Sequence, residues 1–181
     1  QQKIYFTGST NYQKQTFRNR TEIYGANGKL KLTVPIRHTH GHIKSLDKEV
    51  CIAYDMDWQK QHWKSICAAY RSAPYFEFYE ADLEYFYQEK TVLLFDFNLS
   101  LLTQIMALLD LSFSYEIVRW NPNKQKRMDH LIVAKSQEAE NFQTYTQVFE
   151  TKFGFIPNLS ILDVLFNLGP NSGTYFKKVF E

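Results

Sequence analysis

One short basic segment of the sequence is suited to binding an anion. It reads QKQTFRNR and places Lys14, Arg18 and Arg20 beside the amides of Gln13 and Asn19. Guanidinium groups bind phosphate or carboxylate through paired hydrogen bonds, and amide side chains can bind sugar hydroxyls. We therefore predict that these five residues contact an anionic ligand such as a nucleotide-sugar. The alternative is a solvated, cationic strand face.

His62 is the candidate for acid and base chemistry. It lies between Trp58 and Ile66 at helical spacing, with Trp63 next to it. An imidazole titrates near neutral pH, which suits a general acid or base. The alternative is a packed, hydrogen-bonded core histidine. Trp63 adds an aromatic face of the kind that lines pockets for flat or sugar-like ligands.

Three further histidines alternate along the chain, at His38, His40 and His42. An extended backbone would place all three on one side, and three imidazoles can hold a catalytic zinc ion. They lie, however, in a glycine-containing connection just after a strand. We assign no metal site to the chain, and zinc binding at these histidines stays an alternative.

A second anion site is indicated at the start of the last helix that the sequence predicts. Asn158, Ser160 and Asp163 lie there, and the positive end of a helix attracts anions. We count Asn158 and Ser160 among the candidate ligand-binding residues. The alternative is that Asn158 is only a helix cap.

The element that positions the basic segment is a predicted β-hairpin over residues 20–35. Asn27 and Gly28 form the preferred pair for a two-residue type I′ turn, and they separate two β-compatible runs. Counting outward from that turn pairs Ile23 with Leu32 on an apolar face.

The other candidate residues lie on or near predicted helices. Apolar residues recur at helical spacing, with Asp57, Asp96 or Asn98, and Asn158 as caps. The segments with this pattern run over residues 58–70, 74–86, 96–109, 142–153 and 159–168. Short strands are predicted over residues 3–6 and 111–117, and a long loop over residues 119–140 with a brief element at 131–133.

Length and composition complete the prediction of fold class. The 181 residues fit one α/β domain spanning residues 1–181. We expect a small mixed sheet that contains the hairpin and the strand starting at Leu111, covered by several helices. The 17% aromatic content favours a bulky core or an aromatic-lined pocket.

Charge and hydrophobicity exclude several classes of protein. The net charge of +2 is too small to drive binding to nucleic acid. The longest apolar runs, such as residues 92–95, are far shorter than the roughly 18 residues of a membrane span. Cys51 and Cys67 lack the spacing of metal ligands and the density of a disulfide scaffold. We expect a cytoplasmic protein with reduced thiols.

Three groups of short motifs occur in order along nearly the whole chain. The first is NYQKQTFRNR at residues 11–20, followed by GANG and LTVP in the hairpin. The second is Trp58 followed by QHW, AY, APYF and DFN. The third is GFIPNLSILD at residues 154–163, followed by FNLGP. Together they resemble the WbqC-like protein family of bacteria, in the form found in Bacteroidetes.

The resemblance implies a role near gene clusters for surface polysaccharide or O-antigen. Members resembling this chain usually open with a further strand and loop, similar to nucleotide-binding Rossmann-like folds. That opening is absent before Gln1, so one interpretation is a truncated Rossmann-like core whose missing segment completes the site.

The functional expectation is a transferase that modifies an activated amino sugar. Its ligand would be a nucleotide-sugar or glycan, with His62 as acid or base. A non-catalytic protein that binds a glycan or a partner enzyme is the alternative. The sequence assigns no cofactor and no oligomeric state.

Overall fold

The residues that the structure describes form a mixed α/β fold, which confirms the predicted class. The structure is a computed structural model, and it describes residues 4–37, 45–112, 114–123, 128–133 and 142–179. The strands are β1 (Ile4–Phe6), β2 (Arg20–Gly25), β3 (Gly28–Thr33) and β4 (Tyr115–Ile117). The α-helices are α1 (Trp58–Tyr70), α2 (Phe76–Gln88), α3 (Leu94–Leu108), α4 (Glu150–Phe153), α5 (Ile161–Leu168) and α6 (Ser172–Val179). Short 3-10 helices are η1 (Asp47–Glu49), η2 (Asp129–Ile132) and η3 (Gly169–Asn171).

The predicted hairpin is confirmed, but its predicted register is wrong by two residues. The turn residues are Ala26 and Asn27, and Ile23 pairs with Leu30 rather than with Leu32. A type I′ turn at Asn27 and Gly28 needs positive φ at both positions, and here only Gly28 has it, at +95°. Because a shift of two residues preserves the side-chain alternation, Ile23 and Leu32 are still buried on the same face.

The hairpin and β4 do not share a sheet, contrary to the sequence-based expectation. In the described part of the chain, β4 pairs in parallel with β1, and β2 pairs only with β3. The edge of β2 that faces away from β3 also forms hydrogen bonds, but not with a strand. The Glu22 carbonyl accepts from the Ser160 backbone amide at 2.7 Å, and the Tyr24 amide donates to the Tyr70 hydroxyl at 3.0 Å. Helices α1 and α5 therefore occupy the edge that a further strand would need.

Helix starts differ from the predicted caps. α1 begins after Asp57 as predicted, but the Asp57 side chain forms no capping hydrogen bond. α3 begins at Leu94, so Asp96 and Asn98 lie inside the helix rather than before it. The reason is burial, because Leu94 is 2% exposed and its amide donates to the Val50 carbonyl. The packing of Leu94 thus starts the helix earlier than a polar cap would.

The predicted helix over residues 142–153 is wrong for most of its length, since only α4 is helical. The preceding residues bond elsewhere: the Gln147 side chain bonds both backbone groups of Ile156 and the carboxylate of Asp163. The chain also continues as η3 and α6 beyond the predicted end at Gly169. A φ of +55° at Gly169 turns the chain so that Pro170 falls in the first turn of η3.

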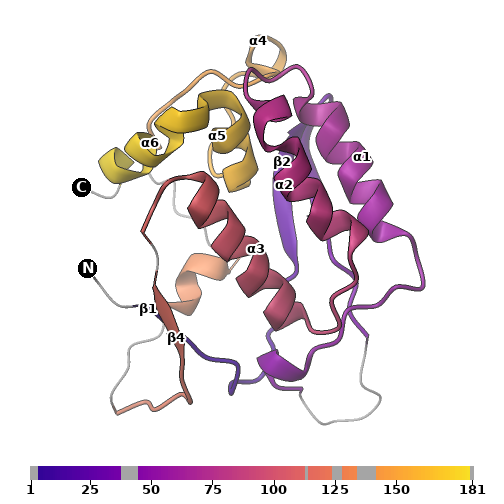
Figure 1. Cartoon of the computed structure of the whole chain (residues 1–181), viewed down its shortest axis with the longest axis vertical. Helices are drawn as coiled ribbons and strands as arrows, with labels where there is room; N and C mark the ends of the chain where they lie inside the picture. Colours follow the sequence, from indigo (N-terminus) through magenta and orange to yellow (C-terminus); the bar gives the residue numbers. More distant parts are fainter. Residues whose placement is uncertain (1–3, 38–44, 113, 124–127, 134–141, 180–181) are drawn as a thin grey trace.

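Two clusters of buried apolar side chains make up the core. The larger joins the hairpin to α1, α2, α3 and α5, and its most buried members are Ile23, Ile66, Tyr70, Phe76, Leu165 and Phe166. The smaller joins the end of β3 and the chain after η1 to α1 and α3, through Val34, Val50, Ile52, Trp58, Leu94 and Phe97. Figure 1 shows α3 crossing the molecule between α5 and α6 on one side and α1 and α2 on the other.

Candidate functional site

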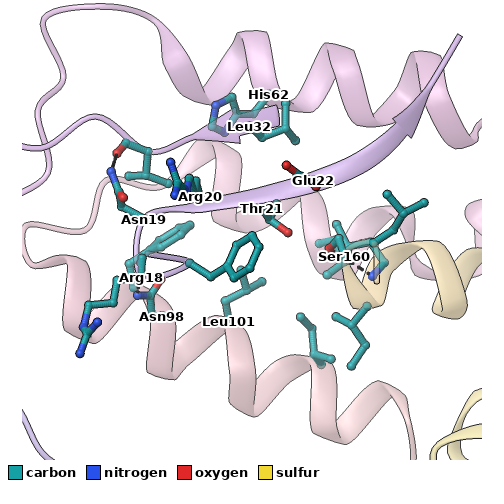
Figure 2. Close-up of a pocket in the computed structure, with 18 of the residues that line it drawn as sticks. Arg18, Asn19, Arg20, Thr21, Glu22, Leu32, His62, Asn98, Leu101 and Ser160 are labelled. Carbon is teal, nitrogen blue, oxygen red and sulfur yellow. Dashed lines mark hydrogen bonds between the residues drawn. The ribbon is translucent and has the colours of Figure 1, made fainter. Parts of the chain in front are cut away.

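A cavity of about 370 Å³ lies where the two core clusters meet. Its walls come from the start of the hairpin, α1, α2, α3, η2 and the N-terminus of α5. Leu32 and Leu162 of the larger cluster line it, and so do Trp58 and Phe97 of the smaller one. In Figure 2, residues before β2 gather near Asn98 at one end, and Ser160 lies at the other. This size falls within the range of small-ligand pockets.

Arg20 is the lining cation best placed to bind an anion. Its guanidinium donates to the backbone carbonyl of Gln15 at 2.6 Å, and no carboxylate among the described residues pairs with it. The side chain is half-buried at the cavity. Donors of Arg20 are therefore left for a phosphate or carboxylate of a ligand.

Arg18 lines the same cavity but its guanidinium is committed to the protein. Nε lies 3.1 Å from Oδ1 of Asp47, and Nη2 lies 3.3 Å from Oδ1 of Asp129. Nη1 donates to the Thr16 hydroxyl, and Figure 2 shows the guanidinium turned away from the labelled residues around the cavity. The two arginines that the sequence presented as equivalent thus have different surroundings.

Two asparagines supply acceptors at the same end of the cavity. Asn19 donates from Nδ2 to the Val34 carbonyl at 3.0 Å, and Asn98 donates from Nδ2 to the Arg18 carbonyl at 2.7 Å (Figure 2). These bonds fix both amide planes. The Oδ1 atoms accept no hydrogen bond from the residues that the structure describes, which suits them to accept from hydroxyl groups of a ligand.

His62 reaches the cavity from α1. Its ring contacts the edge of Trp58, with centroids 5.1 Å apart, and lies 6.4 Å from the ring centroid of Tyr87. Burial lowers the pKa of His62 below its usual 6.5, and a hydrogen bond to the Thr33 backbone carbonyl opposes this shift. At neutral pH the imidazole is therefore uncharged, with one ring nitrogen donating and the other able to accept a proton.

Trp63 also lines the cavity, but both of its ring contacts are with core residues. It stacks on Tyr87 at 5.4 Å and 27°, and on Phe76 at 6.3 Å and 28°. The stacking fixes the orientation of the indole, so Trp63 offers the cavity a rigid aromatic wall.

Ser160 and Asn158 line the cavity at the N-terminus of α5, although their roles are not the predicted ones. Ser160 is the cap of this helix and accepts from the Leu162 amide at 3.4 Å. The prediction that Asn158 caps the helix is wrong. Asn158 has a φ of +56° and is exposed, two residues before the cap.

Several predicted residues are not brought to the cavity. Gln13 and Lys14 are exposed and do not line it. Asp163 is fully buried and points instead into a network with Tyr145 and Gln147. His38, His40 and His42 lie outside the described residues. Within the described ranges, no group of three or more histidine, cysteine or acidic residues is arranged to hold a metal ion.

Other lining residues were missed by sequence reasoning. Trp58, Tyr87, Phe97 and Leu101 were read as core or were not singled out, and Asn98 was read as a helix cap. The high aromatic content was the available signal, but it could not separate core rings from cavity rings. None of the helices in the described part of the chain has the length and apolar composition to cross a bilayer. Cys51 and Cys67 are free thiols.

Comparison with known proteins gives one result. A family model described as the WbqC-like protein family matches residues 2–142 and 125–175. Neither the curated proteins nor the solved structures give a match. The match extends over the hairpin, α1, α2, α3 and α5, all of which line the cavity.

Proposed function

The chain belongs to the WbqC-like protein family, and from this we propose that its cavity binds a nucleotide-linked amino sugar for modification in bacterial surface-polysaccharide biosynthesis. The reaction class is transfer to the sugar, in the cytoplasm, where nucleotide-sugars are used. We propose a single domain over residues 1–181 as the working unit. The nucleotide phosphates would lie near Arg20, and the sugar would lie against the aromatic walls.

One observation carries this proposal: Arg20, His62 and the N-terminus of α5 line the same cavity. Arg20 supplies donors for phosphate, and the carbonyl oxygens of Asn19 and Asn98 are available for hydroxyl groups. The neutral imidazole of His62 can accept a proton from a reacting hydroxyl or amine. The size of the cavity suits a sugar with part of its nucleotide.

A non-catalytic glycan- or partner-binding role is the second candidate, and one observation favours it. Glu22 is the one carboxylate among the described lining residues, and it pairs with Lys29 at 3.3 Å. His62 therefore has no second acid beside it of the kind that many hydrolytic sites use. Mass spectrometry of reaction mixtures decides between the two, since a pure binder is stabilised by nucleotide-sugars but forms no product.

Replacing Arg20 with glutamine should weaken nucleotide-sugar binding by about ten- to a hundredfold, since a hydrogen-bonded charge contributes roughly 1.5 to 3 kcal/mol. Stability should change little, because the one bond that the Arg20 side chain donates is to the exposed carbonyl of Gln15. Isothermal titration calorimetry with UDP-linked sugars measures the affinity, and thermal unfolding measures the stability.

Lys60→Gln is the matched control for Arg20→Gln. Lys60 is exposed on α1 two residues before His62 and does not line the cavity. The Lys60→Gln substitution therefore removes the same charge as Arg20→Gln, but outside the cavity. Equal affinities in the wild type, Arg20→Gln and Lys60→Gln would rule out Arg20 as the phosphate ligand.

If His62 is the base, the fall in activity at acid pH should have its midpoint below pH 6.5. Burial lowers the pKa of this imidazole, so the neutral form persists to lower pH than in a free histidine. His62→Gln should remove this fall and most of the turnover. Titration of the His62 ring protons by NMR gives the midpoint without any substrate, and a value at or above 6.5 would contradict the buried environment.

A further inference from the structure

The indole N–H of Trp58 is a buried donor without an acceptor. Trp58 is 3% exposed, its Nε1 atom is buried, and no described residue accepts its hydrogen bond. A buried polar group left without a partner destabilises a fold by about 1 to 3 kcal/mol. Such a group needs an acceptor that the described residues do not supply, and Trp58 is one of the residues that line the cavity.

None of the rings in contact with Trp58 accepts a hydrogen bond from this donor. The Tyr54 hydroxyl, whose ring lies 5.9 Å from that of Trp58, already donates to the Thr91 carbonyl and accepts from the Thr91 amide. Phe97, in edge contact at 5.9 Å, has no acceptor atom. His62 lies one helical turn away, and its ring contact with Trp58 includes no hydrogen bond to Nε1. No described residue accepts from the indole, and Trp58 lines the cavity, so a ligand in the cavity can supply the acceptor.

We propose that the Trp58 end of the cavity is a subsite for an acylamino group, with the indole N–H donating to the carbonyl oxygen of that group. This inference rests on the proposed function and specifies its substrate class: the sugar carries an N-acyl substituent. The residues involved are Trp58 as donor and Phe97 as the apolar wall beside it.

The chemistry of the subsite favours an acylamino group over the alternatives at the same position of a sugar. The carbonyl oxygen of an acylamino group only accepts hydrogen bonds, which matches a site with one donor. The methyl group of an N-acetyl substituent gains contacts against aromatic rings. A protonated amine has no lone pair for the indole and would lose its hydration there. A hydroxyl can accept the bond but brings a donor that Phe97 cannot satisfy.

The test compares UDP-N-acetylglucosamine with UDP-glucosamine and UDP-glucose as probes. Wild-type protein should bind the N-acetyl probe about tenfold more tightly than either other probe, which corresponds to one hydrogen bond. Trp58→Phe keeps an aromatic ring but removes the donor, and it should lose this preference. Tyr54→Phe removes a polar atom from the same ring cluster outside the cavity, and it should keep the preference.

A second measurement does not depend on the variant folding. The chain has three tryptophans, so its ¹H–¹⁵N spectrum has three indole signals, and Trp58 can be assigned from its ring contacts with His62 and Phe97. Saturation with UDP-N-acetylglucosamine should move the Trp58 indole signal downfield, as a new hydrogen bond does. UDP-glucosamine should not.

The outcomes separate this inference from the proposed function. If no UDP-sugar binds the wild type, both fail. If all three probes bind equally and the Trp58 indole signal stays in place, the inference is overturned and the proposed function stands. A signal that stays in place in every complex also overturns the inference, because the indole then gains no acceptor from the ligand.

Discussion

Replacing Arg18 with methionine is expected to lower the free energy of unfolding by roughly 3 to 5 kcal/mol, the typical cost of removing one partner of a buried ion pair. The Arg18 side chain is 13% exposed and that of Asp47 is 9% exposed. Without the guanidinium, the Asp47 carboxylate keeps the Thr10 hydroxyl at 2.7 Å, but no other cation among the described residues pairs with it. Chemical denaturation followed by circular dichroism measures the loss.

The control for Arg18→Met is the double variant with Asp47→Asn. A neutral amide needs no cation and can still accept from Thr10, so the double variant should be more stable than Arg18→Met alone. A fully additive pair of effects would contradict a direct interaction between Arg18 and Asp47. Figure 2 shows that the side chains of this arginine and Arg20, which are two residues apart in the chain, separate in direction. Of the two, only Arg18 forms ion pairs with described residues, so only Arg18 should affect folding strongly.

Replacing Asp163 with leucine is expected to lower the free energy of unfolding by about 2 to 4 kcal/mol, because two donors lose their acceptor in the interior. Oδ2 of Asp163 accepts from the Tyr145 hydroxyl at 2.6 Å and from Nε2 of Gln147 at 2.9 Å. Asp163 is 0% exposed and Gln147 is 3% exposed. Leucine has the same branched arrangement of four side-chain heavy atoms, so the loss would come from hydrogen bonding rather than from a cavity.

Asp163→Asn is the matched control, since an amide oxygen still accepts from Tyr145 and Gln147. Burial raises the pKa of Asp163 above its usual 3.8, although the hydrogen bonds from Tyr145 and Gln147 and the nearby Tyr70 hydroxyl oppose the shift. The folded state thus holds this proton after the unfolded state has lost it, so wild-type stability falls as the pH rises from 3.8 to the folded pKa. The asparagine variant lacks this fall, so its stability relative to the wild type should rise over that pH range. Equal pH dependence in both proteins would contradict the raised pKa.

Periodicity and turn chemistry predicted the presence of elements better than their ends. The Asn27-Gly28 pair located the hairpin, but the pairing of Ile23 depended on which residue takes positive φ, and this is a property of the folded turn. The start of α3 depended on burial of Leu94, a tertiary contact that no local pattern contains. The segment before α4 has helical spacing, yet Gln147 bonds the backbone of Ile156 instead.

The candidate site was predictable by residue type and less so by role. The sequence identified Arg20 and His62, and the fold places both at one cavity. It could not distinguish Arg20 from Arg18, because the difference lies in Asp47 and Asp129, which are distant in sequence. Whether these residues bind the proposed ligand stays a prediction for the calorimetric experiments.

The position of the cavity between the two core clusters links occupancy to the lifetime of the protein. A ligand that touches Leu162 on one side and Phe97 on the other adds contacts to both clusters at once. Binding to the folded state alone stabilises it by about 2.7 kcal/mol when the free ligand is a hundred times its Kd. In a cell, abundance of the protein would then follow supply of the ligand, since unoccupied molecules would open more often and be degraded first.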